Sequence, residues 1–151
     1  MHKKAKWQLF VDGASRNNPG PAGAGIYLVK DQQKELEKGF FLGIKTNNQA
    51  EYLALIIGLI ISIPKVGQDH LQIISDSLLL VNQLNGIYRV KNPELQVLYQ
   101  KAVKLLNLVS YDVVHVLRHK NQEADKMANL GIDNKIALTP EIKAKVHDAC
   151  L

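Results

Sequence analysis

The sequence of 151 residues has little of what stabilises a secreted or membrane-bound protein. It contains one cysteine, Cys150, which cannot close a disulfide within the chain. Its longest apolar run, residues 52–63, is interrupted only by Gly58 and Ser62, and it is well short of the roughly 18–20 residues that cross a bilayer. No apolar segment of signal-peptide length follows the charged N-terminus. We therefore expect a cytoplasmic protein with no membrane partner.

The sequence also lacks internal repeats, low-complexity segments, and Cys or His residues at zinc-site spacing. Lysine and arginine outnumber aspartate and glutamate by 19 to 14, which gives a formal net charge of +5. These basic residues lie in small separated groups, so no disordered nucleic-acid-binding tail is indicated. The charge permits a polyanionic partner, although a solvated surface of mixed charge explains it equally well.

The apolar share of 46% and the chain length favour one domain with a real core. Short alternating or β-branched runs predict strands at residues 7–12, 22–29, 36–42, 71–75 and 111–117. Helical spacing predicts helices at residues 48–63, 77–84, 93–106, 121–130 and 141–149, with Pro64 ending the first. A meander followed by alternating strands and helices implies an α/β fold with a mixed sheet and helices on its faces. We assign residues 1–132 to this domain and residues 133–151 to a C-terminal tail or accessory helix of it.

Four acidic residues fall where the predicted strands and helices converge. Asp12 ends the first strand and Asp76 follows the fourth, so parallel neighbours would place both at the sheet edge where open α/β sheets bind ligands. Glu51 and Asp125 lie in the first turns of two helices that can point to the same edge. Each residue alone could be a turn former or a favourable helix-end charge. Clustered carboxylates, however, repel one another and would either take up protons or bind cations.

Oxygen ligands alone suit Mg²⁺ or Mn²⁺. Two such ions about 3.5–4 Å apart would activate a water and stabilise the leaving oxygen of a phosphodiester. The neighbouring neutral residues Asn18, Thr46, Asn47 and Asn48 could hold sugar hydroxyls and phosphate oxygens without cancelling the acidic charge. Asn48 could equally cap the helix that follows it.

Taken in order, the segments DGASRNNPGPAGAG, TNNQAEYLAL, SDS, VNQLNGIYRVKN and LRHKNQEADKMAN resemble type 1 ribonuclease H across residues 7–131. The resemblance implies the ribonuclease H-like fold, a five-stranded mixed sheet flanked by helices. It also implies metal-dependent hydrolysis of the RNA strand of RNA–DNA hybrids with two Mg²⁺ ions, leaving a 5′-phosphate and a 3′-hydroxyl.

The resemblance implies specific roles for individual residues. The metal-binding carboxylates of the family fall on Asp12, Glu51, Asp76 and Asp125. Contacts with the minor groove and RNA sugars fall on Asn18, Asn47 and Asn48, and a DNA-strand phosphate is held at Thr46, joined by Asn92. These assigned contacts agree with the chemistry of the substrate. The 2′-hydroxyl distinguishes RNA from DNA, and an A-like minor groove distinguishes the hybrid duplex by its shape.

The chain departs from the best-known bacterial members of this family. Those members carry a basic protrusion for which the short segment from Gly86 to Pro93 leaves no room, so the chain resembles the compact branch found in archaea and some bacteria. They also carry a loop histidine before the last carboxylate, whereas the compact branch places an arginine at Arg118. The usual proline before that arginine is Leu117, and Leu78 occupies a position that is often polar.

Two alternatives to this enzyme remain open from the sequence. One is a nucleic-acid-binding module with an inactive site, although all four carboxylates are present. The other is a nuclease on the same fold that acts on DNA, although such enzymes lack the TNN-x-x-E segment. No feature of the sequence demands more than a monomer.

Overall fold

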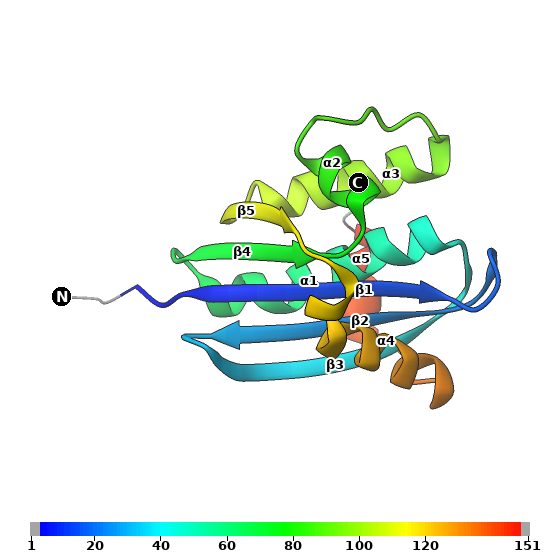
Figure 1. Cartoon of the computed structure of the whole chain (residues 1–151), viewed down its shortest axis with the longest axis horizontal. Coiled ribbons are helices and arrows are strands. Elements are labelled where there is room, and N and C mark those ends of the chain that lie inside the picture. The colour runs from blue at the N-terminus through cyan, green and yellow to red at the C-terminus, as the bar shows by residue number, and fades with distance from the viewer. Residues whose placement is uncertain (1–3, 149–151) are drawn as a thin grey trace.

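The computed structural model describes residues 4–148 and has one five-stranded sheet, in the order β3-β2-β1-β4-β5. The strands are β1 (Trp7–Ser15), β2 (Gly20–Lys30), β3 (Gln33–Lys45), β4 (His70–Ser75) and β5 (Ser110–His115). β1 to β3 form an antiparallel meander, while β4 runs parallel to β1 and β5 parallel to β4 (Figure 1). The predicted mixed α/β sheet is therefore confirmed. Cys150 and the predicted helix end at Ala149 lie outside the described residues.

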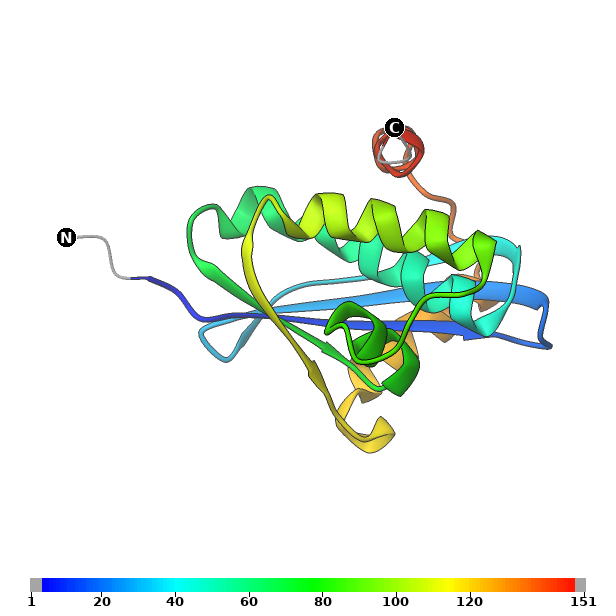
Figure 2. The ribbon, with the colours of Figure 1, turned by 90° about the horizontal axis from the view of Figure 1, so that it is seen from above.

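Helices cover both faces of the sheet (Figure 2). α1 (Asn47–Val66) and α3 (Pro93–Leu106) lie on one face, and α4 (Gln122–Asp133) lies on the other. The remaining elements are α2 (Leu78–Leu84), the short 3₁₀ helix η1 (Arg118–Lys120) and α5 (Pro140–Asp148). α2 and α3 are joined by residues 85–92 alone, so the segment has no room for a protrusion, as the sequence predicted.

α1 is the central helix of the core, and its apolar side chains are buried on nearly every side. Length and composition alone would let it cross a membrane, but most of it is buried within the protein. The prediction that Pro64 ends this helix was wrong, because Pro64 lies inside the last turn. Proline there loses one backbone donor, but the helix continues to Val66 and ends at Gly67, whose φ of 59° suits glycine.

Several strands end at other residues than the sequence predicted, because of how they pair in the sheet. β1 continues three residues beyond Asp12, because Gly13, Ala14 and Ser15 pair with β2 across an antiparallel ladder. β5 ends at His115 rather than at Leu117, although Val116 still donates to the Ser75 carbonyl at 3.0 Å. The chain then leaves the sheet edge and turns through η1 toward α4.

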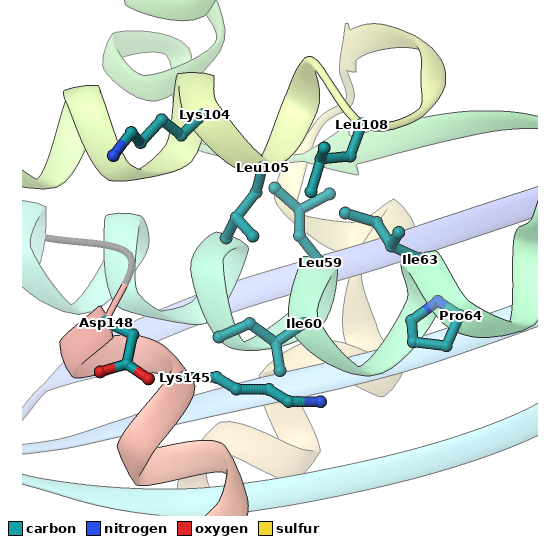
Figure 3. Close-up of a pocket in the computed structure, with 9 residues that line it drawn as sticks. All are labelled: Leu59, Ile60, Ile63, Pro64, Lys104, Leu105, Leu108, Lys145 and Asp148. Atoms are coloured by element: carbon teal, nitrogen blue, oxygen red, sulfur yellow. The ribbon is translucent and has the colours of Figure 1, made fainter. Parts of the chain in front are cut away.

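α5 packs loosely on the α1 side of the molecule, with Ile142 and Val146 against the core and none of its residues fully buried. A cavity of about 510 Å³ lies between α1, α3 and α5 (Figure 3). It is lined mainly by apolar side chains of Leu59, Ile60, Ile63, Pro64, Leu105 and Leu108, with Lys104, Lys145 and Asp148 at its rim. The predicted carboxylates do not line this cavity, so the chemistry must be sought elsewhere.

Candidate active site

Three of the predicted carboxylates meet at the edge where β1 and β4 run side by side. Asp12 lies in β1, Asp76 directly follows β4, and Glu51 lies in the second turn of α1. One carboxylate oxygen from each of the three lies within 4.8 Å of those of the other two. The parallel pairing of Phe10 with Ile74 brings Asp12 close to Asp76, each two residues further along the chain. The topology therefore accounts for the juxtaposition that the sequence suggested.

Position 13, directly after Asp12, has no space for a side chain. A Cβ at this position would lie 2.2 Å from the carbonyl carbon of Ala50 and 2.3 Å from the amide nitrogen of Glu51, which is a severe clash with the backbone of α1. Only glycine lets the strand approach the helix so closely. The approach also lets the Gly13 N–H donate a hydrogen bond to Oε1 of Glu51. One residue thus sets the distance between two carboxylates.

Without a cation, Asp12 and Glu51 resist ionisation. Burial, together with the charges of Glu51 and Asp76, raises the pKa of Asp12 to about 10. Burial also raises the pKa of Glu51, although the Gly13 N–H opposes this effect by stabilising the carboxylate. Crowded carboxylates that resist ionisation are a mark of a cation site, since a bound cation supplies the missing positive charge.

Asp125 is the fourth member of the site and comes from the opposite face of the sheet. Its carboxyl group forms a hydrogen bond with Asp12 that contributes to the raised pKa of Asp12, and its side chain is 33% exposed. α4, which carries Asp125, rests directly on β2, since a Cβ on Gly25 would lie only 1.8 Å from the Ala124 carbonyl oxygen. Gly25 pairs with Asp12 across the β1–β2 ladder, so this main-chain contact brings the start of α4 next to Asp12.

Asn121 is a positioning residue to which the sequence analysis gave no role. Its Nδ2 donates to the Val11 carbonyl at 2.9 Å, one residue before Asp12, and its side chain is buried. The bond ties the start of α4 to the strand that carries the first carboxylate. The signal was present as the first residue of N-x-x-A-D, but its partner is 110 residues away along the chain.

The carboxylates line a cleft of about 360 Å³. Its lining residues are Asp12, Gly13, Ala14, Ser15, Asn47, Asn48, Glu51, Asp76, Ser77, Arg118 and Asp125. The donors that converge here are oxygens, which is the ligand set that Mg²⁺ and Mn²⁺ prefer. The Arg118 guanidinium is 83% exposed, with Nη2 4.0 Å from Oδ1 of Asp125, whereas His119 does not line the cleft.

The structure separates the predicted substrate-binding residues into two groups. Asn47 and Asn48 line the cleft, whereas Asn18, Thr46 and Asn92 do not. Asn18 Oδ1 accepts the Asn47 N–H at 3.0 Å, which holds the loop before β2 against the start of α1.

Two of the three residues outside the cleft cap helices. Thr46 caps α1 in a reciprocal pair with Gln49, so the alternative that Asn48 is the cap was wrong. Asn92 caps α3 by accepting the N–H groups of Glu94 and Leu95. Their side-chain acceptors are therefore already engaged in holding helix ends.

Comparisons with known proteins agree with this geometry. The family model described as "Reverse transcriptase-like" matches residues 10–131. Ribonuclease HI of Halobacterium salinarum is 39% identical over 127 residues, covering 83% of this chain and 63% of that protein. Ribonuclease H of Pseudomonas fluorescens is 33% identical and is covered over 91% of its length. The bifunctional protein Rv2228c of Mycobacterium tuberculosis is 39% identical, but the chain spans only 35% of its length.

Solved structures match over most of the chain. Ribonuclease H1 of Halobacterium salinarum superposes with a TM-score of 0.81 at 38% identity, covering 85% of this chain and 98% of that chain. LC11-RNase H1, solved in complex with an RNA/DNA hybrid, gives the same TM-score at 33% identity and the same coverage. A five-stranded mixed sheet with this carboxylate cluster defines the ribonuclease H-like class of folds. Within that class, the chain belongs to the type 1 ribonuclease H family.

Proposed function

We propose that this protein is a metal-dependent endoribonuclease that hydrolyses the RNA strand of RNA–DNA hybrids. The observation that carries the proposal is the meeting of Asp12, Glu51 and Asp76 within 4.8 Å, joined by Asp125, in a chain of the ribonuclease H family. The products would carry a 5′-phosphate and a 3′-hydroxyl. We further propose that the enzyme acts as a cytoplasmic monomer.

The four carboxylates would hold two Mg²⁺ ions, with Mn²⁺ as a substitute. When bound, such ions activate a water and neutralise charge on the phosphodiester. Asp12, the most buried of these carboxylates, would ionise on binding, because a nearby dication reverses the effect of burial on its pKa. Glu51 would keep its orientation through the Gly13 N–H. The protein would thus supply oxygen ligands from β1, from the end of β4 and from the starts of α1 and α4.

Selection of the hybrid would fall to the neutral side chains beside the cluster. Asn47 and Asn48 open onto the cleft at the start of α1, where they can donate to and accept from a ribose 2′-hydroxyl. The LC11 structure was solved with an RNA/DNA hybrid, which supports a hybrid as substrate here. The first turns of α1 and α3 lie together, because Gln49 and Glu94 are hydrogen-bonded at 2.9 Å. Thr46 and Asn92, which cap these two helices, would therefore approach the DNA strand from the same side.

Arg118 would assist at the scissile phosphate. It lines the cleft beside Asp125 and reaches well into solvent. A guanidinium stays protonated at any working pH, so it cannot act as a general base. Its role would be to orient the phosphate and to neutralise charge as the product leaves.

A cleavage assay on three duplexes tests this function. The protein should cut the RNA strand of a hybrid in Mg²⁺, leave duplex DNA intact, and lose activity in EDTA. Asp76→Asn should abolish cleavage while the variant still folds. Cleavage of duplex DNA with no cleavage of the hybrid would favour a DNA-directed nuclease, and binding of the hybrid with no cleavage would favour a nucleic-acid-binding module.

A further inference from the structure

A chain of polar contacts leads from Asp125 away from the cleft. Asn129, one turn further along α4, donates through Nδ2 to the Asp125 carbonyl at 3.0 Å, and the same nitrogen lies 3.5 Å from Asp125 Oδ1. On its other side, Asn129 Oδ1 lies 3.2 Å from Nη2 of Arg16. Asn129 therefore sits between a carboxylate and a guanidinium.

The guanidinium decides which way the Asn129 amide points. Arginine offers donors and no acceptor, so it must face the amide oxygen. The NH₂ group of Asn129 is then directed at Asp125, where it can hold one carboxylate oxygen. Reversing the amide would set NH₂ against guanidinium and oxygen against carboxylate, and both contacts would be repulsive.

Arg16 itself is held at two further points. Its Nη1 lies 2.6 Å from Oδ1 of Asp133, at the end of α4, and its backbone N–H donates to the Pro21 carbonyl at 2.9 Å. The side chains of Arg16 and Asp133 are 45% and 57% exposed, so this ion pair contributes little to stability. Its consequence is geometric, since it fixes where the guanidinium lies.

Arg16 belongs to a loop that also touches the start of α1. Ser15 donates its backbone N–H to Asn47 Oδ1 at 3.1 Å, and Asn18 Oδ1 accepts the Asn47 N–H at 3.0 Å. The loop thus joins the helix that carries Glu51 to the helix that carries Asp125.

We propose that Arg16 and Asn129 are positioning residues for Asp125. Arg16 fixes the orientation of the Asn129 amide, and Asn129 keeps the Asp125 carboxylate turned toward the other three. The same oxygen, Oδ1, lies 4.0 Å from Nη2 of the exposed Arg118, and the carboxylate is 33% exposed, so without the Asn129 contact it could turn toward solvent. The inference rests on the proposed function, because it gives Asp125 the part of a metal ligand.

The test measures metal binding separately from cleavage. The variants are Asn129→Leu, Arg16→Ala and the double variant, with Asn134→Leu as a control at the end of the same helix. Mn²⁺ binding is measured by calorimetry without substrate, and unfolding is measured in EDTA. Asn129→Leu should weaken Mn²⁺ binding by about 10-fold, as is typical when a partner of a metal ligand is lost, while its stability in EDTA matches that of the control.

Two further comparisons separate positioning from a merely structural role. The double variant should bind Mn²⁺ no more weakly than Asn129→Leu alone, because the two residues act in series. In an Asp125→Asn background, Asn129→Leu should change binding by less than about twofold, since its target is gone. Arg16→Lys should restore part of the affinity lost in Arg16→Ala.

Wild-type affinity in Asn129→Leu would overturn the inference. So would losses that multiply in the double variant, or a loss that persists in the Asp125→Asn background. Failure of the wild-type protein to cleave hybrids would contradict the proposed function. The calorimetric comparison would still test the positioning role, because it measures Mn²⁺ binding without substrate. In cleavage assays, Asn129→Leu should raise the Mg²⁺ concentration for half-maximal rate and leave the KM for the hybrid unchanged.

Discussion

Replacing Asp12 with asparagine should stabilise the metal-free protein. Asp12 is 6% exposed, and burial together with the charges of Glu51 and Asp76 raises its pKa from 3.8 to about 10. At pH 7 the folded protein therefore binds a proton at Asp12 that the unfolded chain does not. Asparagine resembles the protonated carboxyl group in size and charge, so it removes the free-energy cost of this proton uptake.

The size of the effect follows from the pKa difference. The gap between pH 7 and the ordinary value of 3.8 is about 3 pH units, and each unit corresponds to about 1.4 kcal/mol, which gives a ceiling of about 4 kcal/mol. Because the pKa is raised on folding, the wild-type protein loses this stability as pH rises from about 4 toward the folded pKa. The advantage of Asp12→Asn should therefore shrink to about 1 kcal/mol at pH 4.5.

Denaturant unfolding in EDTA at pH 4.5 and pH 7 measures this difference. Glu35→Gln is the matched control, because it removes an exposed carboxylate on β3 outside the cleft. Adding Mg²⁺ should reverse the order of stability, since ligand binding to the folded wild-type protein stabilises it. An equal gain at both pH values, or a gain matched by Glu35→Gln, would refute the account of the cluster as a set of mutually repelling carboxylates.

Three further outcomes are expected. Arg118→Ala should lower turnover by about 10- to 1000-fold, which is the range for a lost electrostatic stabiliser, whereas His119→Ala should change turnover little. Steady-state kinetics that rank the two variants the other way would assign the role to His119 instead. Gly25→Ala should destabilise the fold by about 3 kcal/mol or more, because a methyl group 1.8 Å from the Ala124 carbonyl must push α4 away; an unchanged unfolding midpoint would contradict this. The slope of log affinity against log salt for the hybrid should reflect a handful of phosphate contacts, at about 0.9 per contact, and a slope near 10 in a binding titration would reveal a basic surface not recognised here.

Much of the architecture could be predicted because local pattern and topology agree. The alternating runs gave the five strands in the right order, and the meander followed by strand and helix units fits one mixed sheet. Helix ends were less predictable. Pro64 was taken as a stop, but a proline near a C-terminus interrupts one hydrogen bond, and burial of the surrounding apolar residues outweighs that loss.

The site residues that could be predicted are those whose place follows from the order of the strands. Residues whose role depends on a partner far away in the sequence were harder to predict. Asp12 in β1 and Asp76 directly after β4 each lie two residues beyond the paired residues Phe10 and Ile74 of these parallel strands, so sequence position alone brings them near one another. Asn121 stands in the N-x-x-A-D segment, but its partner and that of Asn129 could not be predicted, because they depend on how α4 docks on β1 and on the loop at Arg16. Thr46 and Asn92 were assigned to substrate from the resemblance, and their capping bonds are visible only in the structure.

The two glycine contacts have a consequence for how this protein can change. Glu51 and Ala124, the neighbour of Asp125, both lie where a helix backbone touches a strand backbone, at Gly13 and Gly25. The distance between such backbones depends on atomic radii and not on the volume of nearby side chains. Substitutions in the apolar core can therefore alter stability without altering the spacing of the carboxylates. Stability and catalysis should be separable traits in this chain, free to diverge among relatives that live at different temperatures.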